Sequence, residues 1–189
     1  GITMIHGVGD ILAKNLIAYC GSAEAVFKET KGKLVKIPGF GEVTAAAVKK
    51  SGVLERAEQE LTFIRKNKIN AFFYLDDQYP SRLKHCPDSP VMVYYKGTAD
   101  LNAQKIVSVV GTRTPTEYGK KLTEQLIEGM KDHGILVVSG LAYGIDVYAH
   151  KLSLNAGLET VGVVAHGLDR IYPQAHASVA TKMKTQGGI

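Results

Sequence analysis

The residues best suited to binding chemistry follow a run of β-branched residues at 106–110. They are Gly111, Thr112 and Arg113, and a helix is expected to begin shortly after them. A guanidinium can grip a phosphate with two hydrogen bonds, a hydroxyl can donate another, and a helix N-terminus favours an anion. The spacing matches neither the G-x-G-x-x-G dinucleotide pattern nor the G-K-[ST] of a P-loop. Neither a dinucleotide nor a nucleoside triphosphate is therefore the leading ligand.

Strands and helices alternate around this loop. Short apolar runs predict strands at 106–110, 135–138 and 160–164, separated by helices at 116–133 and 145–155. This order predicts right-handed βαβ units and a Rossmann-like parallel sheet, so the fold class is α/β. Three glycine-containing loops are then expected to lie together at the carboxyl ends of these β-strands. Side by side, they could bind successive phosphates of one extended polynucleotide. The DNA-binding candidates are Gly111, Thr112, Arg113, Lys120, Lys121, Ser139, Gly140, Gly144, His166, Gly167 and Tyr172.

Several residues near these loops have two interpretations. Asp146 and His150 stand at i and i+4 on one helix, where they form either a metal or acid–base pair or, more commonly, a structural hydrogen bond. His166 is either a phosphate or base contact or part of the loop geometry. Tyr172 either stacks on a base or packs inside the protein. The apolar face of helix 116–133 is expected to comprise Leu122, Leu126, Ile127 and Met130.

The N-terminal segment contains an internal repeat. Residues 2–13 align with residues 34–45 at an offset of 32, and both copies read apolar-x-x-apolar-x-Gly-apolar-Gly-x-x-x-Ala. The glycines allow a hairpin with positive φ and leave N–H groups uncovered at a helix N-terminus. The pattern predicts tandem helix-hairpin-helix motifs, either binding DNA phosphates or serving only as a packing module. The possible N-terminal DNA contacts are Gly7, Gly9, Gly39 and Gly41.

A charged helix is expected at about 53–67, with Ala57, Leu61 and Ile64 as its apolar stripe. Two short strands, 69–75 and 91–95, follow it and are expected to extend the sheet of the next domain. We therefore predict a first domain at 1–68 and a second at 69–189.

Composition supports this interpretation. The net charge is +5, and residues 1–68 hold 11 Lys and Arg against 7 Asp and Glu, which suits contact with a polyanion. No apolar run is long enough to cross a bilayer, and we expect a cytoplasmic protein without a signal peptide. Cys20 and Cys86 lie far apart, outside any C-x-x-C or His/Cys cluster, so neither a zinc site nor a disulfide framework is expected. No metal or cofactor is predicted.

An ordered set of motifs resembles one family. The motifs are Val109–Arg113, Ser139-Gly140-Leu141-Ala142-x-Gly144-Ile145-Asp146-x-x-x-His150, Gly167-Leu168-Asp169-x-x-Tyr172-Pro173-x-x-His176, Tyr79-Pro80-x-x-Leu83 and Pro90-x-x-x-Tyr94-x-x-Gly97. Together with the N-terminal repeat they are similar to the DNA-processing protein A family (DprA, also called Smf). Some members carry a lysine after the Tyr-Pro pair, whereas this sequence has Gln174.

The resemblance implies a non-enzymatic protein that binds single-stranded DNA. It implies protection of incoming DNA in natural transformation, loading of the RecA recombinase, and a homodimer formed through the α/β domain. In the family the Gly-Ser/Thr-Arg loop binds DNA phosphate, which here corresponds to Gly111, Thr112 and Arg113. The N-terminal repeat corresponds to the family's SAM-like domain.

The chain stops midway through the fold that the resemblance implies, and the C-terminal part of the second domain is expected to be missing. A partner chain or a lost segment is then expected to cover the exposed sheet. Two other functions stay open. A Rossmann-like nucleotide phosphoribohydrolase would release free base from a nucleoside monophosphate. An architectural protein would bind duplex and single-stranded DNA equally well.

Overall fold

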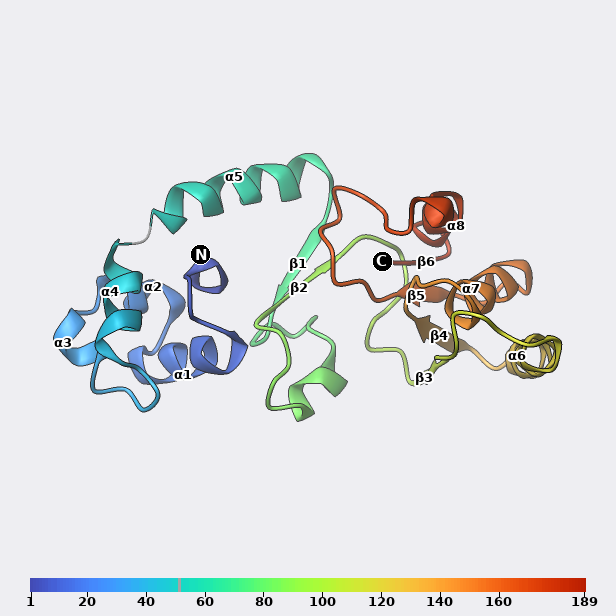
Figure 1. Cartoon of the computed structure of the whole chain (residues 1–189), viewed down its shortest axis with the longest axis horizontal. Helices are drawn as coiled ribbons and strands as arrows, with labels where there is room; N and C mark the ends of the chain where they lie inside the picture. Colours follow the sequence, from blue (N-terminus) through green and yellow to red (C-terminus); the bar gives the residue numbers. More distant parts are fainter. Residues whose placement is uncertain (51) are drawn as a thin grey trace. The chain divides into compact units, whose positions relative to one another are not determined.

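The computed structural model describes residues 1–50 and 52–189 (Figure 1). The chain divides into two compact units, Gly1–Val93 and Tyr94–Ile189. The first unit is mainly helical, and the second is an α/β unit.

Short helices build most of the first unit. They are η1 (Ile2–Met4), α1 (Asp10–Cys20), α2 (Ala23–Lys28), α3 (Lys31–Leu34), α4 (Glu42–Lys50) and α5 (Val53–Lys66). Leu16, Val26 and Leu34 are completely buried in the centre of this unit, together with Ala13 and Ala45. These two alanines occupy the same position in the two copies of the repeat, where a larger side chain would separate the helices.

The repeat seen in the sequence is also a repeat of structure. In the first copy, backbone N–H groups donate from Ile5 to Ile2, from Val8 to Ile5 and from Ala13 to Gly9. The second copy has the same three bonds at the same offset, from Ile37 to Leu34, from Phe40 to Ile37 and from Ala45 to Gly41. Gly7 and Gly39 have φ values of +79° and +81°, which favour glycine. The tandem hairpins are therefore present as predicted.

Helix α5 is shorter by one residue than expected and has no buried residue. Its predicted apolar stripe is only partly covered, because Ala57 and Ile64 are half-buried whereas Leu61 is 48% exposed. Helical spacing correctly places these side chains on one face, but it does not supply a neighbour against which that face can pack.

The two connecting strands were predicted to extend the large sheet, but only the chain directly after the second of them reaches it. There Lys96 and Ile189 exchange two backbone hydrogen bonds, and Gly97 forms an antiparallel bridge with Gly188. Strands β1 (Asn70–Phe73) and β2 (Met92–Tyr95) form a separate two-stranded sheet, with the 3-10 helix η2 (Ser81–His85) between them. Val91 and neighbouring residues pack against the helical core, and the Val91 N–H donates to the Asp10 carboxylate over 2.8 Å. The boundary between compact units therefore lies after Val93, whereas the sequence suggested a domain boundary after 68.

The α/β unit contains a four-stranded parallel sheet in the order β3-β4-β5-β6, so the predicted Rossmann-like fold is confirmed. Its helices α6, α7 and α8 lie along one face of the sheet (Figure 1). The elements are β3 (Lys105–Ser108), α6 (Glu117–Met130), β4 (Ile135–Ser139), α7 (Ile145–Asn155), β5 (Thr160–Gly162), η3 (Gln174–His176), α8 (Ala177–Met183) and β6 (Gly187–Gly188). The expected order of strands and helices is correct as far as β5.

Strand β6 was not predicted, since two glycines carry no strand propensity. Gly187, with φ +140°, lies directly against the backbone of Thr160, where a Cβ would collide. The Tyr95 hydroxyl donates to the Gly187 carbonyl over 2.7 Å, and burial raises the pKa of Tyr95 to about 12. This strand therefore forms through close backbone contact, which side-chain patterns do not reveal.

The apolar face of α6 is narrower than expected. Ile127 and Met130 are buried as predicted, but Leu122 and Leu126 are 52% and 45% exposed. Thr123 is buried on this helix instead, and its hydroxyl donates to the Gly119 carbonyl. Within the described part of the chain, no helix is both long and apolar enough to cross a membrane.

Candidate nucleic-acid interface

Three loops meet at the carboxyl ends of β3, β4 and β5. We call them the first loop (residues 109–116), the second loop (140–144) and the third loop (163–173). Because the three strands are parallel neighbours in the sheet, their carboxyl ends share one edge. Direct contacts join the loops to one another, as the following paragraphs describe, so the structure brings together the residues that the sequence selected.

The first and second loops are held together by backbone contacts. A Cβ at Gly111 would lie 2.7 Å from the Ile145 side chain, and the Ile145 N–H donates to the Thr112 carbonyl over 3.1 Å. Gly144, with φ +85°, lies against the backbone of Thr112 and Arg113, and a Cβ at this position would collide with that backbone. These two glycines therefore allow the second loop to pack closely against the first.

The first loop presents an exposed cation at the entrance to a helix. Gly111, Thr112 and Arg113 are all exposed. The Thr112 hydroxyl accepts the Thr114 N–H over 3.2 Å, and Thr116 caps α6 by accepting the Gly119 N–H. Within the described residues, no ion pair involving Arg113 is found. An exposed cation thus lies close to the N-terminus of α6, an arrangement that is compatible with anion binding.

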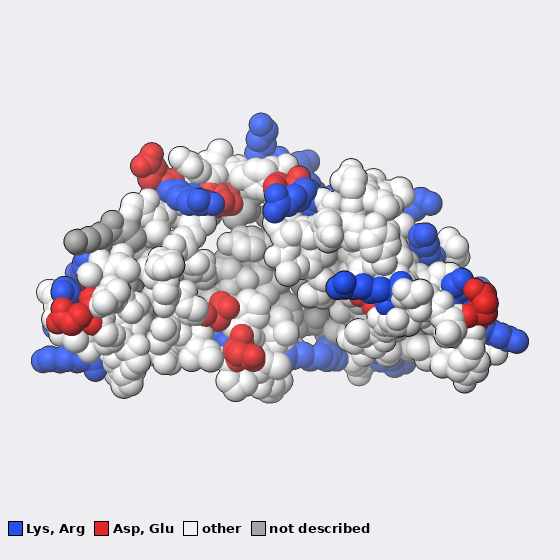
Figure 2. Space-filling view, viewed as in Figure 1, with Lys and Arg blue, Asp and Glu red and all other residues white. Residues whose placement is uncertain are grey.

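The two lysines that follow differ in their availability. Lys121 is exposed, whereas the Lys120 ammonium lies 2.6 Å from a carboxylate oxygen of Glu117. An anion that recruits Lys120 must compete with this carboxylate. Figure 2 shows Lys and Arg in small separate groups on the face in view, with uncharged surface and several acidic groups among them.

Ser139 does not face solvent. Its side chain is only 3% exposed, and its hydroxyl donates to the Val109 carbonyl over 2.5 Å. Its hydroxyl therefore ties the end of β4 to the end of β3 and is not placed to meet DNA. Gly140 and Gly144 are half-buried, so they too act mainly by shaping the loops.

Asp146 and His150 form neither an exposed acid–base pair nor a metal pair. His150 is completely buried, with Nε2 2.6 Å from the Gly140 carbonyl and Nδ1 2.7 Å from the Thr160 hydroxyl. Burial lowers the pKa of His150, so the neutral ring carries its proton on Nε2, where only an N–H can bond the carbonyl. No cluster suited to a metal ion is found among the described histidines, cysteines and acidic residues.

The Asp146 carboxylate lies in the first turn of α7 and is 7% exposed. One of its oxygens, Oδ1, is buried with no hydrogen-bond partner in the structure, and Oδ2 would lie 2.5 Å from a Cβ at Gly140. Free N–H groups at a helix N-terminus favour a negative charge at this position. Asp146 therefore fills the space that Gly140 leaves open and supports the second loop.

The third loop is closed by its own histidine. His166 Nδ1 donates to the Gly167 carbonyl over 2.9 Å, and His166 Nε2 accepts the Tyr172 N–H over 3.2 Å. Both ring nitrogens are therefore occupied inside the loop. Tyr172 itself is 72% exposed, so of the two interpretations the buried aromatic is wrong. Gly167 is exposed beside it.

Two further residues of the interface were missed in the sequence. His176 is buried and donates from Nδ1 to the Leu141 carbonyl over 2.7 Å, which joins the segment after the third loop to the second loop. Tyr143 is 51% exposed and meets the His176 ring edge-on, with 4.8 Å between ring centroids. An aromatic residue inside a glycine-rich loop is the signal that could have found Tyr143, and His176 was quoted only as part of a family motif.

The N-terminal hairpins offer a weaker anion site than their glycines suggest. Gly7, Gly9, Gly39 and Gly41 are exposed, but an acidic residue stands in the first turn of each following helix, Asp10 in α1 and Glu42 in α4. These carboxylates oppose the approach of a phosphate.

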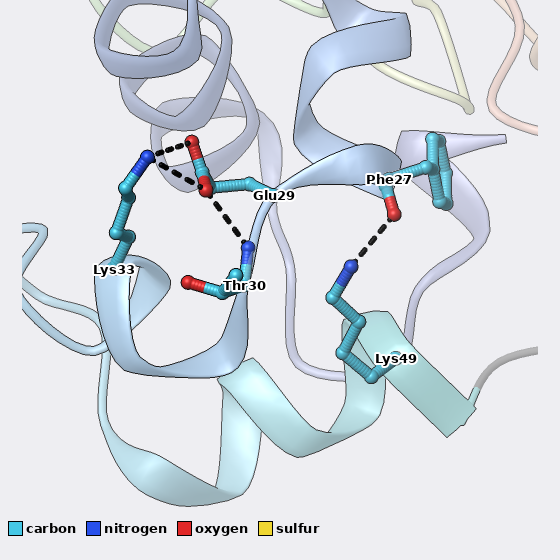
Figure 3. Close-up of polar contacts among 5 residues, drawn as sticks. All are labelled: Phe27, Glu29, Thr30, Lys33 and Lys49. Carbon is cyan, nitrogen blue, oxygen red and sulfur yellow. Dashed lines mark hydrogen bonds and ion pairs between the residues drawn. The ribbon is translucent and has the colours of Figure 1, made fainter.

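Many lysines of the first unit are also engaged inside it. Lys33 pairs with Glu29, which accepts the Thr30 N–H as well, and Lys49 donates to the Phe27 carbonyl over 2.7 Å (Figure 3). The Thr30 bond lowers the pKa of the Glu29 carboxyl. The other engaged lysines are Lys14, Lys28 and Lys31. At least five of the 11 Lys and Arg residues at 1–68 thus make hydrogen bonds or ion pairs inside this unit.

The fold and the arrangement of the loops together define a class: Rossmann-like proteins with loops gathered at the strand ends, preceded by tandem helix-hairpin-helix motifs. A model of the family described as DNA recombination-mediator protein A matches residues 70–189. The chain belongs to this family.

Individual relatives agree with the family match. The chain is 42% identical to the DNA processing protein DprA of Streptococcus pneumoniae over 109 residues, covering 58% of this chain and 38% of the relative. It is 28% identical to protein Smf of Synechocystis over 205 residues, covering 99% of this chain and 48% of the relative. The chain thus spans less than half the length of these curated relatives.

Solved structures show the same likeness. The X-ray structure of DprA from Streptococcus pneumoniae matches with a TM-score of 0.75 and 28% identity, covering 96% of this chain and 62% of that one. The DprA structure from Helicobacter pylori matches with a TM-score of 0.56 and 28% identity, covering 64% and 54%. The latter is described as giving insight into that protein's single-stranded DNA binding mode.

Proposed function

We propose that this chain is the single-stranded DNA-binding part of a recombination mediator, and that its α/β unit makes the main contact. The observation that carries the proposal is the exposed Arg113 on a loop that Gly144 and Ile145 support from below. The single-stranded DNA binding named for the Helicobacter pylori relative supports it.

In the proposed complex, a DNA phosphate lies at the first loop. The Arg113 guanidinium binds two phosphate oxygens, the Thr112 hydroxyl donates to one of them, and the N-terminus of α6 adds its partial positive charge. Contacts of this kind position a strand without reading its sequence. The second and third loops then receive the next nucleotides of the same strand.

The wider activity of the family is part of this proposal. We propose that the full-length protein protects incoming DNA in natural transformation, loads RecA on it and acts as a cytoplasmic homodimer without enzymatic activity. The family match and the relatives named DNA processing protein support this assignment.

A salt titration tests the proposed phosphate contact. Arg113→Ala should weaken oligo(dT) binding about tenfold and reduce the slope of log affinity against log salt by about 0.7, the value for one released counterion on a single strand. The matched control is Lys131→Ala, which removes one positive charge immediately after the far end of α6. An unchanged affinity and slope for Arg113→Ala would exclude the first loop as the phosphate site.

Competition with duplex DNA separates this proposal from an architectural role. Binding through strand-end loops should favour single-stranded over duplex DNA of the same length. The acidic residues and engaged lysines of the N-terminal hairpins oppose strong duplex binding there. Equal affinity for the two forms would favour the architectural role.

A further inference from the structure

Two exposed tyrosines at the three-loop surface are each held by a histidine. Tyr172 is 72% exposed and Tyr143 is 51% exposed, although both lie in loops that are otherwise closely tied by hydrogen bonds. Tyrosine has a large apolar ring with one polar atom, and leaving this ring exposed to water does not stabilise the folded state. The contacts that hold the two rings outward therefore indicate a use for them.

Tyr172 is held through its backbone. The Tyr172 N–H donates to His166 Nε2 over 3.2 Å, and His166 Nδ1 donates to the Gly167 carbonyl over 2.9 Å. A carbonyl can only accept, so Nδ1 is the donor and Nε2 the acceptor in these two hydrogen bonds. The imidazole thus spans the third loop from its start to its end and fixes the point from which the Tyr172 side chain leaves.

Tyr143 is held through its ring. It meets the ring of His176 edge-on at 4.8 Å between centroids, with an interplanar angle of 70°. His176 is 5% exposed and is fixed in turn by the hydrogen bond from its Nδ1 to the Leu141 carbonyl. Edge-on contact leaves part of the Tyr143 ring free while restricting its motion.

The charges near these tyrosines suit bases better than phosphates. The first loop ends in the exposed Arg113, whereas the third loop carries both Asp169 and Arg170 and adds no net charge. Asp169 lies close to Gly167, since a Cβ there would be 2.5 Å from Asp169 Oδ1. A phosphate is therefore favoured at the first loop, and an uncharged group is favoured beside the tyrosines.

We propose that Tyr172 and Tyr143 are stacking surfaces for unpaired nucleobases, and that His166 and His176 are positioning residues that hold them. The proposal rests on the proposed function and deepens it, because it names the part of the strand that the second and third loops bind. A duplex keeps its bases stacked inside, so the tyrosines give the surface a physical basis for preferring single strands. Stacking is tolerant of sequence, since every base offers a flat face.

The test compares oligo(dT) with an abasic deoxyribose-phosphate strand of the same length. The wild-type chain should bind oligo(dT) about five- to one-hundred-fold more tightly, the range expected for one or more base–aromatic stacks. Tyr172→Ala and Tyr143→Ala should each remove part of this preference and leave abasic binding unchanged. Tyr19→Ala is the matched control, since Tyr19 is 63% exposed in the helical unit.

Arg113→Ala gives the complementary result. It should weaken oligo(dT) and abasic binding by the same factor, because both strands carry the phosphate. If the wild type binds neither strand, the proposed function itself fails, and the stacking proposal fails with it. If the wild type binds both strands equally, or the tyrosine variants weaken both equally, the stacking proposal alone is overturned.

The role of His166 is tested by rescue and by a double variant. His166→Ala should lower the preference for oligo(dT), whereas His166→Gln should restore much of it, because a glutamine oxygen can accept the Tyr172 N–H. His166→Ala combined with Tyr172→Ala should lose no more than Tyr172→Ala alone, since both changes remove one stacking surface. Fully additive losses, or failure of glutamine to rescue, would contradict the positioning role.

Discussion

At the scale of single residues, the interface depends on glycines that permit backbone contact. Gly144 combines a positive φ with a site directly below the first loop, whereas Gly157 has a similar φ of +76° and open space around it. The pair therefore compares a positive-φ glycine packed against another backbone with a positive-φ glycine in open space. Such residues shape the loop without touching the ligand.

We predict that Gly144→Ala destabilises the protein by at least 2 kcal/mol more than Gly157→Ala, as an order-of-magnitude expectation. Both variants force an alanine to a positive φ, but only the first also drives a Cβ into the Thr112 and Arg113 backbone. Urea unfolding of the two variants measures the difference. Similar midpoints for the two would show that the first loop moves away freely and is not held by the second.

His150 predicts a pH dependence of stability. Burial lowers the pKa of His150 in the folded state, while the unfolded chain keeps the ordinary histidine pKa of about 6.5. Below about pH 6.5 the unfolded state therefore binds more protons than the folded state. The contribution of His150 to the free energy of unfolding is complete above about pH 6.5 and declines as the pH falls toward the lower folded pKa.

The free energy of unfolding, measured by urea titration at pH 8 and pH 5.5, should therefore decrease at the lower pH. His150→Gln should be less stable at pH 8 and should lose less on acidification. An unchanged pH dependence in His150→Gln would show that other groups are responsible.

At the scale of elements, the two hairpins are alike in backbone but differ in what their first-turn acid does. Asp10 accepts the N–H of Val91, which is 2% exposed, while Glu42 pairs with Lys31 at the surface. The offset of 32 residues places these acids at the same position in the two copies. Glu42 is therefore a matched control for measuring how much the hydrogen bond between Asp10 and Val91 contributes to folding free energy.

Asp10→Ala should cost about 1–3 kcal/mol of folding free energy, because it leaves a buried N–H without a partner. Glu42→Ala should cost less than about 1 kcal/mol, the range for an exposed ion pair. Thermal or urea unfolding of the two variants is the measurement. Equal costs would mean that the Asp10–Val91 bond does not secure β2 to the helical core.

At the scale of the whole molecule, the sequence correctly predicted the elements and motifs that are determined by the pattern of nearby residues. Buried β-branched runs separated by amphipathic helices were enough for β3, β4, β5 and the Rossmann-like class. The paired glycines and their apolar flanks, repeated at an offset of 32 residues, were enough for the tandem hairpins. In both cases the spacing and type of nearby side chains determine the local conformation.

The rest depends on partners distant in sequence. Strand propensity identified β1 and β2, but it did not show that they pair with each other. Nor did it show that only the residues directly after β2 reach the large sheet. Helical spacing placed Leu122 on the apolar face of α6, although nothing covers enough of it to bury it. Ser139 looked available for DNA because its bond to Val109, 30 residues away, is invisible in the sequence. The same reason hid His176 and its contact with Tyr143.

The central claim is that three adjacent loops of the α/β unit form one surface for single-stranded DNA. Backbone amide NMR of the ¹⁵N-labelled chain, titrated with oligo(dT), tests it most directly. We predict that shifts appear together at residues 111–114, 140–144 and 166–172 and saturate at one common affinity. Shifts confined to the hairpin glycines at 7–9 and 39–41, with the three loops unchanged, would contradict the claim.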